Sequence, residues 1–310
     1  MQFFINFMPY HVPILLEACL EGLNIKPNGV YVDVTFGGGG HSKAVLERLG
    51  PDGKLFGFDQ DPDAKAQSKL ITDPRFTFVE ANFRNLSKYL RVFKVQKVDG
   101  ILADFGISSH QIDDGARGFS TRFDGPLDMR MNPKLEVSAF SIVNKYPAEQ
   151  LHKILGMYGE IRNAKTLATG IVSARANQTI ETTGQLIKIL EKFAPRGKEF
   201  RFYAQVFQAI RIEVNEELLV IEEFLSQTPA LLQPEGRLAV LTFHSLEDRL
   251  VKNFIRSGKF SGDVEKDFFG NELRPLQAVN RKPIEADQAE ILLNNRSRSA
   301  KLRIAELFVP

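Results

Sequence analysis

The sequence predicts an α/β fold in which a sheet domain, made from both ends of the chain, is interrupted by an inserted all-helical subdomain. Three observations support this prediction. In the first third of the chain, short β-branched runs alternate with helical stretches, which is typical of parallel sheets covered by helices on both faces. From about residue 112 to 215 helical patterns take over and no buried strand is recognisable. Beyond this stretch, apolar strand patterns return.

The first third supplies four predicted strands, each a short run rich in β-branched or aromatic residues. They are Gly29–Thr35, Lys54–Asp59, Phe76–Glu80 and Val98–Asp104. A helix is expected at His41–Leu49, and another at Asp61–Ile71. In the second helix Pro62 lies near the first turn, where its missing N–H costs no hydrogen bond, and Asp61 is expected to cap the helix.

The middle of the chain carries apolar residues at three- and four-residue steps, which predicts helices. The expected helices are Ala148–Met157, Ala164–Ala176, Thr183–Phe193 and a long one over Tyr203–Leu225. A strand is expected next at Arg237–Phe243, then a helix from near Leu246 and a last strand at Lys301–Phe308. The predicted domains are therefore 8–111 with 216–310 for the sheet, and 112–215 for the helical insert.

Composition excludes several classes of protein. The chain has 310 residues, a net charge of +2 and one cysteine, Cys19, so it has no internal disulfide framework or multi-cysteine metal site. A single cysteine fits a reducing, cytoplasmic compartment. The histidines His11 and His41 are too scattered for a metal site, and no apolar run is long enough to span a membrane, so we expect neither metal nor membrane. Nucleic-acid binding would have to depend on local basic patches.

The strongest local motif is a glycine turn, Gly37–Gly40, between the first strand and the helix that follows it. Glycines adopt positive φ and allow a ligand to approach the backbone, and a helix N-terminus offers free N–H groups. The turn fits the dinucleotide fingerprint G-x-G-x-x-G poorly, because Ser42 stands where the third glycine is expected. A glycine turn alone is weak evidence, since a tight turn without a ligand has the same pattern.

Polar and aromatic residues at the ends of the next strands strengthen the prediction of a ligand site. Asp59 lies 20 residues after Gly39, where an acid accepts hydrogen bonds from both ribose hydroxyls of a nucleoside. Phe83 follows the third strand, where an adenine ring could lie, and Asp104 ends the fourth. Because the carboxyl ends of parallel strands meet at one edge, these residues predict one nucleoside-binding site.

Several longer motifs occur in order between Met8 and the C-terminal region: MPYHVPILLEACL, DVTFGGGGHS, FGFDQDP, ANFRNL, VDGILADFGISSHQIDDGARGFS, GPLDMRM, FQAIRIEVNEEL, GRLAVLTFHSLEDRLVK and NNRSRSAKLR. In these motifs and their spacing the chain resembles the RsmH (MraW) family, whose members are bacterial rRNA cytosine-N4 methyltransferases that use S-adenosylmethionine. The sequence departs from the family in having glycine at position 38 and His110 in place of a proline, and residues 1–7 precede the usual family start.

The resemblance implies a Rossmann-like class I methyltransferase sheet with the helical insert as an RNA-recognition subdomain. It implies that S-adenosylmethionine is bound by Gly39, Gly40, His41, Asp59, Phe83, Asp104 and Gln111. The implied reaction is methylation of the N4 amine of a decoding-region cytidine in 16S rRNA, within the small ribosomal subunit. The sequence does not decide whether the chain forms a homodimer.

Asp104 and Asp128 are the predicted catalytic carboxylates. For Asp104 two roles stay open, as acceptor of the amine hydrogens or as ligand of the amino-acid end of the cofactor, and the resemblance favours the second. Asp124 and Asp128, at the glycine-rich start of the insert, are alternative carboxylates to Asp104, although turn chemistry explains Asp124 better. Methylation at cytosine C5 would need a cysteine nucleophile, and Cys19 lies in an apolar helical pattern, so we expect it to be a core residue.

The motif HSLED could suggest a hydrolase triad of His244, Ser245 and Asp248, but it lacks a G-x-S-x-G elbow. We expect Ser245 to cap the following helix, and the motif could instead line the base pocket. Near the C-terminus, basic residues predict contact with RNA phosphates, namely Arg296, Arg298, Lys301 and Arg303. In the insert, Arg117, Arg122 and Arg130 are candidates for a second RNA surface.

Three alternatives to the rRNA methyltransferase remain open from the sequence. The chain could methylate DNA or a small molecule with the same chemistry. It could be a nicotinamide-dependent oxidoreductase that uses the same sheet edge. It could also be an RNA-binding assembly protein that transfers no methyl group.

Overall fold

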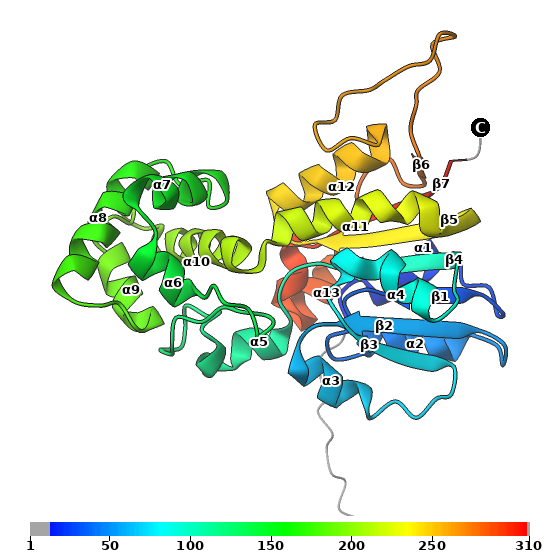
Figure 1. Ribbon diagram of the computed structural model, residues 1–310, viewed down its shortest axis with the longest axis horizontal. Helices are drawn as coiled ribbons and strands as arrows, with labels where there is room; N and C mark the ends of the chain where they lie inside the picture. The colour runs from blue at the N-terminus through cyan, green and yellow to red at the C-terminus, as the bar shows by residue number, and fades with distance from the viewer. Residues whose placement is uncertain (1–12, 309–310) are drawn as a thin grey trace, which may run out of the picture. The chain divides into compact units, whose positions relative to one another are not determined.

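A computed structural model describes residues 13–308, and it divides the chain into two compact units. Unit 1 contains Met1–Gly106 and Val220–Pro310, and unit 2 contains Ile107–Leu219 (Figure 1). The boundaries between the two units, at 106/107 and 219/220, lie within five residues of the domain limits expected from the sequence. His11 and the first residues of the motif MPYHVPILLEACL lie outside the described part.

Unit 1 is built on a seven-stranded sheet with the order β3-β2-β1-β4-β5-β7-β6. Strands β3, β2, β1, β4 and β5 run parallel to one another, and β7 runs antiparallel to both β5 and β6. The strands are β1 (Val30–Asp33), β2 (Lys54–Asp59), β3 (Phe76–Glu80), β4 (Val98–Asp104), β5 (Leu232–Thr242), β6 (Leu276–Ala278) and β7 (Lys301–Leu307). Strands β2, β3 and β4 have the bounds that the sequence predicts.

Helices cover both faces of this sheet (Figure 1). One apolar core lies under α4 (Leu86–Val92), α11 (Glu217–Leu231) and α12 (Ser245–Ser257), and a second lies under α1 (Leu16–Leu23) and α2 (Gly40–Arg48). The remaining elements of unit 1 are α3 (Pro62–Ser68), the 3-10 helix η1 (Phe83–Asn85), α13 (Gln288–Leu293) and the 3-10 helix η3 (Asn295–Ser299). Double coverage explains why β4 is an almost continuous apolar run, because both faces of it are buried.

Unit 2 is helical and has its own apolar core. Its elements are α5 (Ser109–Asp113), the 3-10 helix η2 (Gly115–Arg117), α6 (Ala139–Lys145), α7 (Ala148–Met157), α8 (Ala164–Asn177), α9 (Thr183–Leu190) and α10 (Glu199–Asn215). Within its described residues, pairing of extended backbone is limited to an isolated bridge between Pro126 and Thr182. The expected absence of buried strands from this stretch is therefore confirmed.

The single helix predicted over Tyr203–Leu225 is wrong, because the chain breaks at Glu216 into α10 and α11. Glu216 adopts a left-handed conformation with φ of 50°. The side chain of the preceding residue, Asn215, bonds to the carbonyls of Met129 and Arg211, which pins the end of α10. Apolar residues continue at helical spacing across the break, so periodicity alone does not reveal it.

Within residues 13–308, no helix is both long and apolar enough to cross a membrane.

Candidate functional site

The carboxyl ends of three neighbouring parallel strands in unit 1 place three aspartates at one edge of the sheet. Asp33 ends β1, Asp59 ends β2 and Asp104 ends β4. Because β1 pairs with both β2 and β4, these carboxylates come from adjacent strands. This is the edge at which open α/β sheets bind ligands. Asp33 is a site residue that the sequence analysis missed, because the predicted first strand ran two residues too far and placed Asp33 inside it.

The glycine turn after β1 approaches Asp59 through its backbone. The N–H of Gly37 donates to Asp59 Oδ2 at 2.8 Å, and the N–H of Asp61 donates to Oδ1 at 2.9 Å. Burial raises the pKa of Asp59 to about 6, although these two hydrogen bonds act in the opposite direction. Asp59 is still partly exposed, so it can accept further hydrogen bonds from a ligand.

Two of the predicted cofactor glycines are also required by packing. Gly39 has a φ of 76°, and a Cβ there would lie 2.6 Å from the Phe36 ring. A Cβ at Gly40 would lie 2.5 Å from Pro13. Gly39 is the N-cap of α2, so the turn leads directly into that helix. The glycines therefore serve the close packing of this turn, besides keeping its backbone open to a ligand.

His41 and Asp33 form a buried polar pair behind the turn. Asp33 Oδ2 accepts from the hydroxyl of Ser42 at 2.7 Å, and its Oδ1 accepts from the N–H of Thr35 at 3.1 Å. Burial raises the pKa of Asp33, with the charge of His41 acting against it. Burial lowers the pKa of His41, whose Nε2 lies 3.1 Å from the carbonyl of Ile14. His41 is therefore a neutral ring at neutral pH.

Asp104 has the most unusual environment at this edge. Its Oδ2 lies 3.8 Å from His41 Nδ1, whereas its Oδ1 is buried and lacks a hydrogen-bond partner among residues 13–308. Burial, followed by the negative charges of Asp33 and Glu247, raises the pKa of Asp104 to about 8. A buried carboxylate oxygen without a partner is costly, so a donor or a cation from a ligand would stabilise it.

Aromatic rings line the position after β3. The half-buried ring of Phe83 stacks on Phe105, with ring centroids 5.8 Å apart, and meets Phe224 edge to face at 5.4 Å. Asn82 caps η1 by accepting from the N–H of Arg84 at 2.9 Å. Phe83, which the sequence predicts to lie beside an adenine ring, is therefore held in place by its aromatic neighbours in unit 1.

The HSLED motif begins α12, but its cap is His244 and not Ser245. His244 Nδ1 lies 3.4 Å from the N–H of Glu247, whose Oε2 in turn accepts from the N–H of Phe243 at 2.7 Å. Glu247 is fully buried, and its charge contributes to the raised pKa of Asp104. Sequence reasoning missed it because acids in a first helical turn ordinarily serve the helix dipole. Asp248 forms an ion pair with Arg303, so the motif does not form a hydrolase triad.

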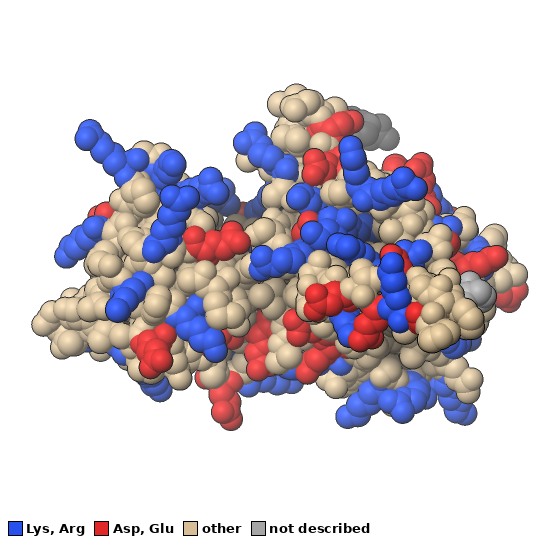
Figure 2. Space-filling model, turned by 90° about the horizontal axis from the view of Figure 1, so that it is seen from above, with Lys and Arg blue, Asp and Glu red and all other residues tan. Residues whose placement is uncertain are grey.

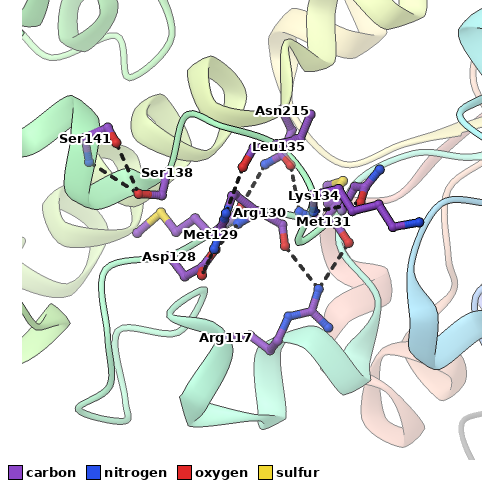
Figure 3. A network of polar contacts seen from close by, with 11 residues as sticks. Arg117, Asp128, Met129, Arg130, Met131, Lys134, Leu135, Ser138, Ser141 and Asn215 are labelled. Carbon is purple, nitrogen blue, oxygen red and sulfur yellow. Dashed lines mark hydrogen bonds and ion pairs between the residues drawn. The ribbon is translucent and has the colours of Figure 1, made fainter.

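Asp128 lies in a network within unit 2 (Figure 3). Its carboxylate accepts from Arg130 Nε at 2.8 Å and from Arg130 Nη2 at 2.7 Å. Burial would raise the pKa of Asp128, but the hydrogen bonds and charge of Arg130 outweigh it and lower the pKa. Met129, between the two, is buried with a φ of 57°, and its carbonyl accepts from Asn215 at 2.8 Å. The loop at Met129 is therefore held both by the ion pair between Asp128 and Arg130 and by the hydrogen bond from Asn215.

Asp124 and Gln111, also in unit 2, both accept hydrogen bonds from backbone N–H groups. Asp124 accepts from the N–H of Gly184 at 2.8 Å, in the first turn of α9 and 60 residues away in the chain, so this partner is not the local turn that the sequence suggested. Gln111 is buried, and its Oε1 accepts from the N–H of Ser108 at 2.9 Å in a capping box of α5. The predicted role of Gln111 toward a cofactor stays a prediction.

The four predicted RNA-binding residues of the tail have different environments. Arg303 is mostly buried and donates to both carboxylate oxygens of Asp248, at 2.7 and 3.1 Å, so its charge is neutralised internally. Lys301 Nζ lies 3.9 Å from Asp248. Arg298 is exposed and Arg296 is half-buried. Arg298 is thus the most accessible of the four, and Lys301, like Arg296, is half-buried. Cys19 is fully buried, as expected, and burial raises its pKa.

Comparison with known proteins gives consistent matches along the whole chain. A model of the MraW methylase family matches residues 8–308. The chain is 57% identical over 297 residues to the ribosomal RNA small subunit methyltransferase H of Cytophaga hutchinsonii, which covers 96% of this chain and 99% of that protein. It is 54% identical over 298 residues to the protein of the same name from Christiangramia forsetii, with 96% and 98% covered.

Likeness to solved structures is weaker. An rRNA methylase from Streptococcus thermophilus is 13% identical with a TM-score of 0.38, over 95% of this chain and 94% of that one. A likeness of this size carries no argument about function.

Proposed function

Because the chain belongs to the MraW methylase family, we propose that it transfers a methyl group from S-adenosylmethionine to RNA of the small ribosomal subunit. The names of the two relatives support the RNA part of this proposal. The finer proposal, taken from the family resemblance, is that the acceptor is the N4 amine of a decoding-region cytidine in 16S rRNA. The cofactor part of the proposal depends on Asp104, whose buried Oδ1 has no hydrogen-bond partner among residues 13–308 and lies at an acidic edge of the sheet.

The residues at this edge fit S-adenosylmethionine. Asp59 is partly exposed and oriented by two N–H groups, which suits it to accept hydrogen bonds from ribose hydroxyls. The half-buried face of Phe83 suits an adenine ring. When bound, the cofactor supplies an electrophilic methyl group on a positively charged sulfur. A carboxylate with a strongly raised pKa favours a cation as its neighbour, and Asp104 meets that condition.

The contacts of His41 assign the position of its proton. The Ile14 carbonyl only accepts, so the contact at 3.1 Å assigns the proton of neutral His41 to Nε2. The lone pair of His41 then lies on Nδ1, 3.8 Å from Asp104 Oδ2. The acceptor nitrogen of His41 therefore faces the Asp104 carboxyl.

The two roles of Asp104 predict different kinetics for Asp104→Asn. If Asp104 holds the cationic end of the cofactor, the variant loses affinity for S-adenosylmethionine, measured by calorimetry. If it accepts the amine hydrogens, affinity is retained and kcat falls. We propose the first role, in line with the family resemblance.

For the substrate, we propose that Arg298 and Lys301 contact RNA phosphates, with Arg296 beside them and Arg303 supporting Lys301 through the shared Asp248. Asp128 is proposed to act through the loop that it shares with Arg130, and Gln111 to act toward the cofactor, as the resemblance implies. A cytoplasmic location and a homodimer stay predictions from the sequence.

The test is methyl transfer from labelled S-adenosylmethionine to assembled small subunits, naked rRNA and DNA, followed by mass spectrometry of the nucleosides. We expect N4-methylcytidine in small-subunit RNA. Transfer to DNA alone, or methylation at C5, would contradict the proposal. Binding of a nicotinamide cofactor with indifference to S-adenosylmethionine would favour the oxidoreductase alternative.

A further inference from the structure

Helix α12 carries a row of basic side chains on its outer face. Its inner face is buried and holds Leu246, Val251, Phe254 and Ile255. Its exposed face holds Arg249, Lys252 and Arg256, which we call the α12 basic row. Positions i, i+3 and i+7 fall on one side of a helix, and the rise of an α-helix separates the first from the last by about 10 Å. The row is therefore continuous along two turns.

No ion pair within residues 13–308 neutralises the charges of the α12 basic row. Among residues 13–308, no carboxylate lies within 4.0 Å of the charged nitrogens of Arg249, Lys252 or Arg256. Asp248, the acidic residue next to Arg249 in the chain, is mostly buried and is held by Arg303 at 2.7 Å. A solvated surface helix usually alternates charges of both signs. Figure 2, which looks onto the side of unit 1 where α11 and α12 lie, shows Lys and Arg side chains gathered over this region.

The row starts at the ligand edge of the sheet. α12 begins three residues after the end of β5, and Glu247 in its first turn is close enough to Asp104 to raise the pKa of that carboxyl. Lys301, the first residue of β7, pairs in the sheet with Thr242, the last residue of β5. Lys301 and the α12 basic row therefore both lie near the end of β5, at the same edge of the sheet.

We propose that the α12 basic row binds phosphates of an RNA strand next to the nucleotide that enters the sheet edge. The inference rests on the proposed function and specifies the path of the substrate. Long side chains with free cationic ends, spaced along about 10 Å, suit successive phosphates of an extended strand. Such contacts position the RNA without reading its bases. The row therefore contributes affinity that does not depend on sequence, while base recognition takes place at the sheet edge.

The test uses the triple variant Arg249→Gln, Lys252→Gln, Arg256→Gln. Its affinity for a single-stranded rRNA fragment is measured by fluorescence anisotropy at a series of salt concentrations and is compared with that of the wild type. Each phosphate contact to a single strand contributes about 0.7 to the slope of log affinity against log salt. Loss of three contacts lowers the slope by about 2, which is about a hundredfold weaker binding at 0.1 M salt if the affinities converge at 1 M. In steady-state methylation, KM for RNA rises and kcat stays the same, since no residue of the row touches the reacting atoms.

The matched control is Lys88→Gln, Arg91→Gln, Lys94→Gln on and just after α4. These three side chains are also exposed, and they too have no ion-pair partner in the described part of the chain. The control removes the same net charge from a different surface, so we expect a much smaller change of slope. Equal losses in the two variants, or an unchanged slope in the α12 variant, would overturn the inference. Loss of binding to assembled subunits with normal binding to naked rRNA would also overturn it, because the partner would then be a protein.

The inference and the proposed function fail separately. RNA binding is measured on protein without cofactor, so a wild-type chain that binds RNA through the row but transfers no methyl group contradicts the proposed function alone. A wild-type chain that methylates rRNA while the α12 variant keeps its affinity contradicts the inference alone. Melting temperature and affinity for S-adenosylmethionine check that the variant is folded.

Discussion

Replacing Asp104 by asparagine should stabilise the ligand-free protein while weakening its function. Asp104 has a buried oxygen without a hydrogen-bond partner among the described residues, and its pKa is raised to about 8. A raised carboxyl pKa means that the folded state holds the proton more tightly than the unfolded state does. Stability attributable to Asp104 is therefore highest below pH 4 and falls as the pH rises through about 8.

The size of the effect follows from the pKa shift. A rise from 3.8 to about 8 corresponds to about 4 pH units, each worth about 1.36 kcal/mol, so the upper limit is about 6 kcal/mol. The side chain of Asp104 is still 28% exposed, and solvent reduces this limit to a few kcal/mol. Asparagine keeps the size of the side chain without the charge. At pH 8 the melting temperature of the variant should exceed that of the wild type by roughly 5 °C or more.

The assay is thermal unfolding of both proteins without cofactor, from pH 5 to pH 9. The difference in melting temperature should grow as the pH rises and level off above pH 8. Adding S-adenosylmethionine should raise the melting temperature of the wild type more than that of Asp104→Asn, because a ligand that binds only the folded state stabilises it. A variant that is less stable at pH 8, or a difference that does not change with pH, would refute the reasoning.

Three further predictions concern the same unit. Asp59→Asn should weaken binding of S-adenosylmethionine roughly tenfold to a hundredfold by calorimetry, since charge-assisted hydrogen bonds to the ribose are lost; unchanged affinity would remove Asp59 from the site. Gly39→Ala should lower the free energy of unfolding by about 1–3 kcal/mol in urea titrations, because of its positive φ and the 2.6 Å approach of Phe36; an unchanged midpoint would contradict this. Cys19→Ala should keep methyl transfer nearly intact, and complete loss in a folded variant would contradict the amine mechanism.

Most of the sheet could be predicted from the sequence because its strands are buried on both faces. Apolar runs such as Val98–Asp104 end abruptly at polar or glycine residues, so their bounds are clear. The antiparallel direction of β7 could not be predicted, because strand direction leaves no trace in the apolar pattern. The break at Glu216 was also hidden, since it depends on contacts of Asn215 with Met129, 86 residues away in the chain.

Some residues of the candidate site could be placed from the sequence for a related reason. Asp59 and Asp104 follow clear strand ends, and a strand end is a local feature of the sequence. Glu247 could not be recognised, because its influence on Asp104 depends on how β5 and α12 pack beside β4. The internal pairing of Arg303 with Asp248 was equally invisible, since 55 residues separate them. Residues that act through neighbours distant in the chain can be identified only from the structure.

The charge at the sheet edge distinguishes between two cofactors that use such edges. Burial raises the pKa of Asp33, Asp59 and Asp104, and the charged neighbours that raise the pKa of Asp104 are themselves acidic. A dinucleotide would bring a doubly negative pyrophosphate toward this cluster, where like charges repel at low dielectric. A sulfonium cofactor brings a positive charge, which relieves the same repulsion and lowers these pKa values on binding. Proton release on binding, measured by calorimetry in two buffers, should therefore accompany S-adenosylmethionine, and its absence at pH 7 would argue against Asp104 as the partner of the cation.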